Sequence, residues 1–192
     1  MKPPGEMTDE WQDGWLEGIR RVPSPNCDER PANEAATLIV IHAISLPPSR
    51  FGGPYIERLF TNTLDPGDHP YFTGIAALRV SAHFLIRRDG EPIQFVSCDR
   101  RAWHAGQSRW QGREACNDFS IGIELEGSDD AAFEDAQYER LIALIGLIAR
   151  RYPIAALAGH ADIAPARKTD PGPHFAWPRL TRPGLPPHVV GF

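Results

Sequence analysis

Proline and glycine constrain the fold of this chain most, because 19 prolines and 17 glycines interrupt its 192 residues. Such frequent interruption predicts short helices and strands joined by turns. The first 36 residues are expected to form an irregular lead-in, since Pro23, Pro25 and Pro31 exclude a long helix there. The ends of the chain, residues 1–14 and 181–192, are expected to be flexible.

Four segments have the patterns of β-strands. Thr37–His42 is continuously apolar and rich in β-branched residues, as expected of a central strand buried on both faces. Val80–Ile86 and Ile93–Val96 flank the turn signal Arg88-Asp89-Gly90 and predict a hairpin. Phe119–Glu126 alternates between apolar and polar positions, so its polar side chains should share one face of a strand.

Two segments have helical patterns. Gly53–Phe60 predicts a short helix, and Glu134–Arg150 carries apolar residues at helical spacing, with a proline just beyond its end. A short apolar stretch, Ile154–Ala158, leads into His160. No repeat or linker divides the chain. We therefore expect residues 1–192 to form a single α/β (α+β) domain, with a central mixed β-sheet flanked by helices. The strand order cannot be predicted from the pattern.

Charge and apolar patterning exclude several classes of partner. The net charge of -5 argues against nucleic acid as a ligand. The acidic N-terminal segment lacks the apolar core of a secretory signal, and the longest apolar stretch, Leu141–Ala149, is too short to cross a membrane. Three cysteines cannot all pair, which favours a reducing compartment. A cytoplasmic monomer with neither nucleic-acid nor membrane partners is therefore expected.

Two of the seven histidines stand at positions typical of functional groups. His42 closes an apolar strand, and His160 follows Gly159 at the end of another apolar segment. Asp170 lies ten residues further on, where Pro171 restricts the backbone. Two imidazoles and one carboxylate match a catalytic zinc site with an open fourth position. The spacing alone makes these three residues candidate metal ligands and does not establish that they share an ion.

Four segments together resemble a known family. They are IVIHAISLPPSRFGGPYI, LRVSAHFLIRRDGEPIQFV, RAWHAGQSRWQGREACNDFSIGIELEG and GHADIAPARKTDPGP. They are similar to the AmpD-type N-acetylmuramoyl-L-alanine amidases, which act on 1,6-anhydro-muropeptides. These amidases belong to the type 2 amidase superfamily, together with peptidoglycan recognition proteins and a phage lysozyme. The resemblance extends from about Trp15 to about Leu180.

The resemblance implies one Zn²⁺ held by His42, His160 and Asp170, and catalytic roles for Glu124 and Lys168. Zinc lowers the pKa of a bound water to about 7. Glu124 would move the proton of this water to the leaving amine, and Lys168 would stabilise the oxyanion. Glu126 shares a strand face with Glu124, so the alternation does not separate these two candidate bases. The resemblance favours Glu124.

Substrate contacts are predicted for three further residues. Arg79 and Arg113 could bind carboxylates of the stem peptide, and Trp103 could pack on the sugar or peptide. His83 and His104 are expected to support the site or the fold rather than bind the metal. Many relatives carry asparagine where this chain has Ala43 and arginine where it has Ala115, which puts the details of peptide binding in doubt.

The resemblance implies hydrolysis of the amide between (1,6-anhydro-)N-acetylmuramic acid and L-alanine in small muropeptides. The absence of a secretory signal favours recycling of imported peptidoglycan fragments over attack on the polymer. Two alternatives stay open. A phage-type endolysin amidase would act on intact peptidoglycan, but no wall-binding module is evident. A non-catalytic peptidoglycan-binding module is disfavoured because all the candidate ligands and catalytic residues are present.

Overall fold

The computed structural model describes residues 7–190, and its centre is a six-stranded mixed sheet. Its strand order is β12-β5-β11-β6-β7-β3. The strands are β3 (Arg20–Arg21), β5 (Leu38–Ile44), β6 (Phe84–Ile86), β7 (Pro92–Gln94), β11 (Ser120–Glu126) and β12 (Ala156–Gly159). β12, β5, β11 and β6 run parallel, whereas β7 is antiparallel to β6 and parallel to β3. The mixed central sheet is confirmed, and so are the predicted strands along it.

Three two-stranded antiparallel ribbons surround the sheet. They pair β1 (Trp11–Gln12) with β2 (Trp15–Leu16), β4 (Cys27–Glu29) with β8 (Arg100–Ala102), and β9 (Arg109–Trp110) with β10 (Arg113–Glu114). The lead-in is therefore more regular than its prolines suggest, since β1 to β4 all lie within it. Strands of two or three residues are too short to carry an alternating pattern, and β3 and β4 pair with strands that lie far along the chain.

The two predicted helices are present as α1 (Tyr55–Phe60) and α2 (Asp135–Arg151). A capping interaction begins α2, because Gln137 Oε1 accepts the backbone N–H of Glu134 (3.0 Å). The remaining helical elements are short: α3 (His160–Ile163) and the 3-10 helices η1 (Pro70–Gly74), η2 (Cys116–Phe119) and η3 (Trp177–Leu180).

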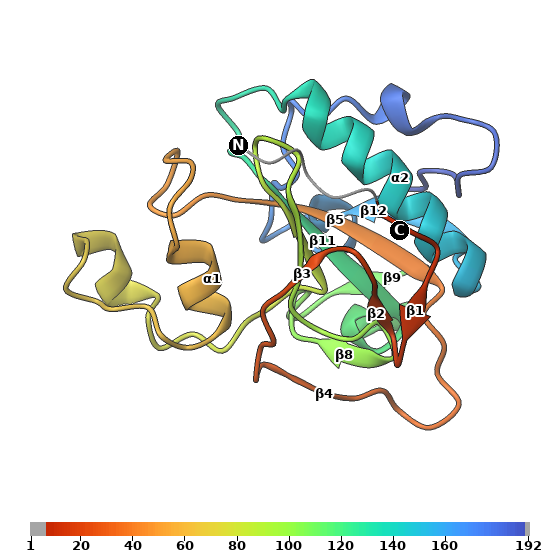
Figure 1. Cartoon of the computed structure of the whole chain (residues 1–192), viewed down its shortest axis with the longest axis horizontal. Helices are drawn as coiled ribbons and strands as arrows, with labels where there is room; N and C mark the ends of the chain where they lie inside the picture. The colour runs from red at the N-terminus through yellow and green to blue at the C-terminus, as the bar shows by residue number, and fades with distance from the viewer. Residues whose placement is uncertain (1–6, 191–192) are drawn as a thin grey trace.

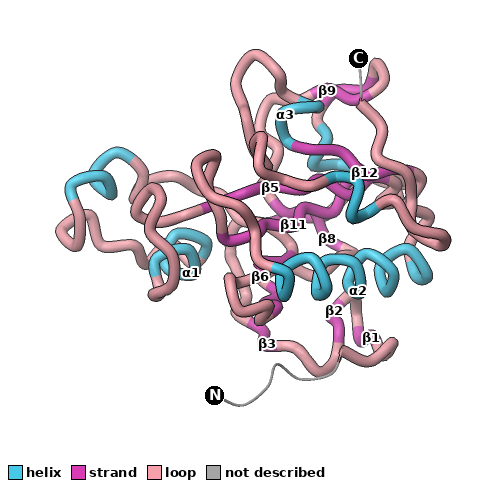
Figure 2. Tube along the Cα trace, turned by 90° about the horizontal axis from the view of Figure 1, so that it is seen from above, coloured by secondary structure: helices cyan, strands magenta, loops and turns pink. Residues whose placement is uncertain are grey.

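Both faces of the sheet are covered (Figures 1 and 2). α2 lies along one face, where its Leu141, Ile145 and Ile148 pack with alternate residues of β5 and β11, including Ile41 and Ile123. The other face packs against the segment that carries β9 and η2. All seven residues of β11 are buried, so its polar positions face the interior instead of solvent. The polar face of this strand is therefore available to build an enclosed site.

The functional face of the sheet is the one opposite α2. Glu124 of β11 lies in register with His42 of β5, so both side chains project from the same face. β12 pairs with β5 up to Gly159, which lies opposite Ile41, and His160 follows immediately. The carboxyl ends of three parallel strands therefore meet at these residues, as is typical of α/β sites.

A long excursion between β5 and β6, residues 45–80, carries α1 and η1 away from the sheet, to the left in Figure 1. Apolar residues of the excursion, among them Leu59, Phe60 and Phe72, form a second core cluster. This cluster extends to Leu85 and Phe95 near the sheet. The excursion is thus packed against the fold rather than suspended from it.

A buried ion pair ties the start of the excursion to the sheet. Glu126 is 1% exposed, and its Oε1 accepts the N–H of Gly52 (2.6 Å) and a bond from Arg87 Nη1 (3.2 Å). The other terminal nitrogen of Arg87 donates to the Gly53 carbonyl (2.9 Å) and to Glu57 of α1 (2.7 Å). Glu126 therefore stabilises the fold by joining β11 to the start of the excursion.

Replacing Glu126 by alanine is expected to lower the free energy of unfolding by about 1–3 kcal/mol, because Arg87 keeps Glu57 as a partner but Arg87 Nη1 and the Gly52 N–H lose a buried acceptor. Urea unfolding followed by circular dichroism measures the loss. Glu126→Gln keeps an oxygen for the Gly52 N–H and should be affected less. An alanine variant that unfolds at the urea concentration of the wild type would contradict the assignment.

The two predicted flexible ends fall partly outside the described residues, since 1–6 and 191–192 are not described. Within the described part, β1 pairs with β2, and the N–H of Val189 donates to the Leu157 carbonyl (3.0 Å). Flexibility of the ends stays a prediction. Between residues 7 and 190, no helix has the length and apolar character needed to cross a bilayer.

Candidate active site

A cavity of about 380 Å³ opens at the carboxyl ends of β5, β11 and β12. One side of it is polar and is formed by His42, His104, Glu124, His160, Lys168 and Asp170. The facing side is largely apolar and comes mostly from the excursion: Leu46, Pro48, Leu59, Phe60, Tyr71, Ile75, Leu78 and Val80. A reactive polar cluster thus faces a surface suited to the apolar parts of a substrate.

The three predicted metal ligands lie together in this cavity. His42 Nδ1 is 2.9 Å from His160 Nδ1 and 3.2 Å from Asp170 Oδ2, and His160 Nδ1 is 3.1 Å from the same oxygen. Both histidines are buried, and these three residues form a group able to hold a metal ion. Asp170 is brought near by a backbone bond, in which the Ala161 N–H donates to its carbonyl (2.8 Å).

The hydrogen bonds around the two rings show which nitrogens carry protons. His160 Nε2 lies 3.2 Å from the Ala105 carbonyl, which can only accept, so this nitrogen is the donor. His42 Nε2 lies 2.9 Å from Nδ1 of His104. The other nitrogen of His104 faces Ser120 Oγ (3.2 Å), whose own proton goes to the Cys116 carbonyl (2.6 Å). His104 Nδ1 therefore accepts, and His42 Nε2 donates.

This assignment leaves unprotonated nitrogens at the centre of the cluster. Burial and, to a smaller extent, the neighbouring His160 lower the pKa of His42 to about 4, although Asp170 opposes the shift. The ring of His42 is therefore neutral at pH 7. The Nδ1 atoms of the two rings and one carboxylate oxygen of Asp170 converge at one point, an arrangement suited to a cation. Two imidazoles and one carboxylate also match the ligand set of catalytic zinc, so the residues fit the ion that the sequence predicted.

Glu124 lines the cavity beside this cluster. The residue is 8% exposed, and its Oε2 is buried without a hydrogen-bond partner among the described residues. Burial raises the pKa of Glu124 well above its usual range; the Asp170 charge raises it further, and Lys168 opposes the rise. A carboxylate with an unoccupied oxygen facing a cavity is suited to accept and return a proton.

The two candidate bases of β11 differ in their surroundings. Glu126 is absent from the cavity lining, and its oxygens are occupied by Arg87 and by the backbone N–H groups of Gly52 and Arg88. Glu124 has a free oxygen and lies at the cavity. The geometry thus favours Glu124, which the alternation of the strand could not do.

Lys168 approaches the cavity from the segment after α3. Its backbone N–H donates to the Ala164 carbonyl (3.0 Å), which holds the turn that leads to Asp170. Lys168 lines the cavity with His42 and Glu124. A positive charge is therefore present beside the proposed base and ligands.

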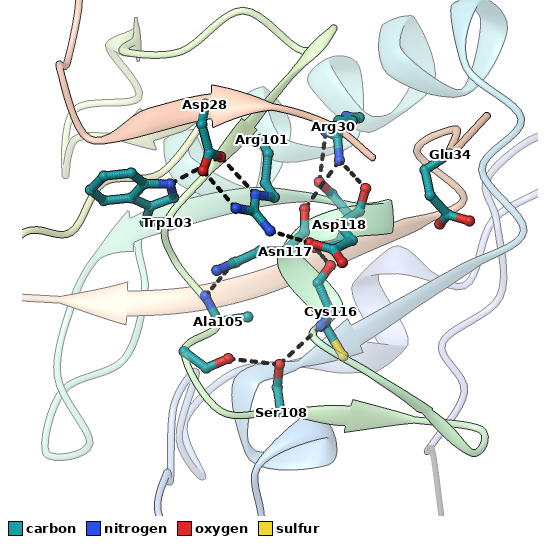
Figure 3. Close-up of polar contacts among 12 residues, drawn as sticks. Asp28, Arg30, Glu34, Arg101, Trp103, Ala105, Ser108, Cys116, Asn117 and Asp118 are labelled. Atoms are coloured by element: carbon teal, nitrogen blue, oxygen red, sulfur yellow. Dashed lines mark hydrogen bonds and ion pairs between the residues drawn. The ribbon is translucent and has the colours of Figure 1, made fainter. Parts of the chain in front are cut away.

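The three residues predicted to contact the substrate have other partners. Arg79 donates to the carbonyls of Ala77 (3.1 Å) and Leu78 (3.2 Å), and the Trp103 indole donates to Asp28 (3.1 Å; Figure 3). Arg113 pairs with Glu34 and stacks over the Phe119 ring. None of the three is among the described residues that line the cavity, so substrate contacts by them stay a prediction.

Two parts of the site were not visible in the sequence. The apolar wall comes from the excursion, whose residues show no catalytic pattern. Asn117 accepts hydrogen bonds from the backbone beside the histidine cluster, and its only signal was its place in the matched segment NDFSIGIELEG. Of the two departures from the family pattern, Ala43 lines the cavity, whereas Ala115 lines a separate one.

Comparison with known proteins agrees with this geometry. The family model described as N-acetylmuramoyl-L-alanine amidase matches residues 32–173. The chain is 62% identical over 170 residues to the 1,6-anhydro-N-acetylmuramyl-L-alanine amidase AmpD of Citrobacter freundii, covering 88% of this chain and 91% of that protein. A crystal structure of a selenomethionine AmpD derivative superposes with a TM-score of 0.86 at 62% identity, covering 88% of this chain and 96% of that one.

A more distant neighbour was solved with a ligand. The Escherichia coli amidase AmiD, in complex with the substrate anhydro-N-acetylmuramic acid-L-Ala-D-gamma-Glu-L-Lys, is 30% identical and has a TM-score of 0.59. The match covers 92% of this chain and 65% of AmiD.

Proposed function

This chain belongs to the N-acetylmuramoyl-L-alanine amidase family, and we propose that it hydrolyses the amide between 1,6-anhydro-N-acetylmuramic acid and L-alanine in muropeptides, with one zinc ion as cofactor. The observation that carries the proposal is the convergence of His42, His160 and Asp170 beside the unpaired carboxyl oxygen of Glu124. The 1,6-anhydro substrate is proposed from the names of the relatives.

Zinc would be held by the Nδ1 atoms of His42 and His160 and by the Asp170 carboxylate. When bound, it supplies Lewis acidity, which makes a water molecule nucleophilic at neutral pH and polarises the amide carbonyl. The outer N–H groups of the two histidines, bonded to His104 and Ala105, keep both rings turned toward this position.

Glu124 moves the proton. Its free oxygen accepts a proton from the attacking water and returns it to the nitrogen of L-alanine as the carbon–nitrogen bond breaks, because an unprotonated amine is a poor leaving group. The raised pKa of Glu124 helps the first step, because a higher pKa makes the carboxylate a stronger base. The buried position also keeps bulk water from taking over this transfer.

Lys168 stabilises the negative oxygen of the tetrahedral intermediate with its ammonium group. Replacing it by alanine should lower kcat by about a hundredfold or more while leaving the metal bound. Steady-state kinetics together with zinc analysis tests this. Arg150→Ala, which removes a positive charge from the far end of α2, is the control. Unchanged kcat in the Lys168 variant would assign the oxyanion to other groups.

We further propose that the enzyme acts in the cytoplasm on soluble fragments during peptidoglycan recycling. Incubation with a defined 1,6-anhydro-muropeptide, followed by mass spectrometry, should yield free peptide and anhydro-sugar. A chelator should abolish both products, and added zinc should restore them. Faster release from intact sacculi than from the muropeptide would instead favour an endolysin, and ligand binding without hydrolysis would favour a binding module.

A further inference from the structure

The outer N–H groups of both histidine ligands donate hydrogen bonds to two consecutive residues, His104 and Ala105. His42 Nε2 donates to the ring of His104 (2.9 Å), and His160 Nε2 donates to the carbonyl of Ala105 (3.2 Å). Any movement of this dipeptide would therefore turn both rings at once. Such outer contacts orient metal-binding imidazoles and influence metal affinity.

One side chain contacts both residues of this dipeptide, and Arg167 Nη2 also donates to the Ala105 carbonyl (2.8 Å). Asn117 Oδ1 accepts the backbone N–H of His104 (3.1 Å) and that of Ala105 (2.8 Å; Figure 3 shows the second). No other polar contact fixes both of these N–H groups among the described residues. A single amide oxygen thus contacts both residues that accept hydrogen bonds from the two histidine ligands.

Asn117 is itself held by its neighbours (Figure 3). Arg30 donates to the carbonyls of Asn117 (3.2 Å) and Asp118 (2.9 Å). The Asp118 carboxylate pairs with Arg101, whose guanidinium also binds Asp28 (2.6 Å). The dipeptide is therefore held by a network that extends back to the lead-in.

The ring of His104 has no room to move independently. A Cβ placed on Gly122 would lie 2.5 Å from its Cγ, so the ring packs directly on the backbone of β11. Ser120 Oγ fixes its far nitrogen (3.2 Å). Displacement of the His104 ring therefore requires displacement of its backbone, whose N–H donates to Asn117 Oδ1.

We propose that Asn117 is a positioning residue that sets the affinity of the site for its metal through His104 and Ala105. The inference rests on the proposed zinc site and deepens it. Losing the Asn117 oxygen leaves two backbone N–H groups without their partner and releases the acceptors of both ligands together. The expected consequence is zinc binding that is about 10- to 100-fold weaker.

The test measures the zinc dissociation constant of the purified chain by competition with a chromophoric chelator. Asn117→Ala should show the full loss, whereas Asn117→Asp keeps the accepting oxygen and should stay close to the wild type. Ser108→Ala is the matched control, because it removes bonds to Cys116 (3.1 Å) and Gly106 (3.2 Å) without touching the dipeptide. Urea unfolding of each metal-free variant separates affinity from stability.

Two outcomes overturn the inference alone. The first is a zinc dissociation constant of Asn117→Ala equal to that of the wild type. The second is zinc binding weakened equally in Asn117→Ala and Ser108→Ala, in proportion to the stability that each loses without metal. Zinc binding that is absent from the wild-type protein overturns the proposed function as well. If the alanine variant does not fold, Asn117→Ser takes its place, since its hydroxyl is too short to reach both N–H groups, and the same 10- to 100-fold loss is required.

Discussion

Replacing Asp170 by alanine is expected to leave the protein without bound zinc and without amidase activity. Two imidazoles would remain, whereas catalytic zinc sites in proteins use three protein ligands. The substitution also removes the negative charge that would offset the ion. Metal analysis after gel filtration should find zinc in the wild type and almost none in the variant.

A thermal measurement extends this test. A ligand that binds only the folded state raises the melting temperature as its concentration rises. Added zinc should therefore stabilise the wild-type protein and leave Asp170→Ala unchanged. Asp130→Ala is a suitable control, because that carboxylate lies 3.5 Å from Ser49 Oγ, outside the ligand cluster. Stoichiometric zinc in the Asp170 variant would refute the proposed ligand set.

Replacing Glu124 by glutamine is expected to keep zinc bound and to lower kcat by about 10²- to 10⁴-fold. Glutamine has nearly the same shape, so the cavity and the neighbouring His42 should be little disturbed. It cannot accept the proton of water or return it to the amine. Steady-state kinetics on a 1,6-anhydro-muropeptide gives the loss, and metal analysis verifies that the site is intact.

Glu126→Gln is the matched control for this second prediction. Both carboxylates lie on the same face of β11, but that of Glu126 is occupied by Arg87 and by backbone N–H groups. Its glutamine variant should therefore retain kcat within a few-fold even where its stability is reduced. The reverse pattern, an active Glu124 variant and an inactive Glu126 variant, would transfer the proton-moving role to Glu126.

The longest elements of the fold followed from local patterns. β5, β11 and α2 have seven or more residues each, enough to display continuous burial, alternation or helical spacing. β1 to β4 escaped prediction because two or three residues show no period, and β3 and β4 pair with the distant strands β7 and β8. The strand order likewise depends on long-range parallel pairing, which has no local signature.

The site was predictable where side-chain chemistry marks it. His42 and His160 stand at strand ends and Asp170 beside a proline, and the structure brings all three together. Glu124 and Glu126 could not be separated, because the difference between them is made by Arg87 and Gly52, which belong to other segments. Asn117 acts through backbone N–H groups, which every residue type except proline supplies, so its partners leave no pattern.

The division of the cavity between two parts of the chain has an evolutionary consequence. The reactive side comes from strand ends and the segment after α3, whereas most of the apolar side belongs to the single excursion of residues 45–80. Insertions, deletions or exchanges within that excursion would change which molecules are admitted without rebuilding the catalytic centre. Substrate preference could therefore change along this one segment, provided that its contacts with Glu126 and Arg87 are kept.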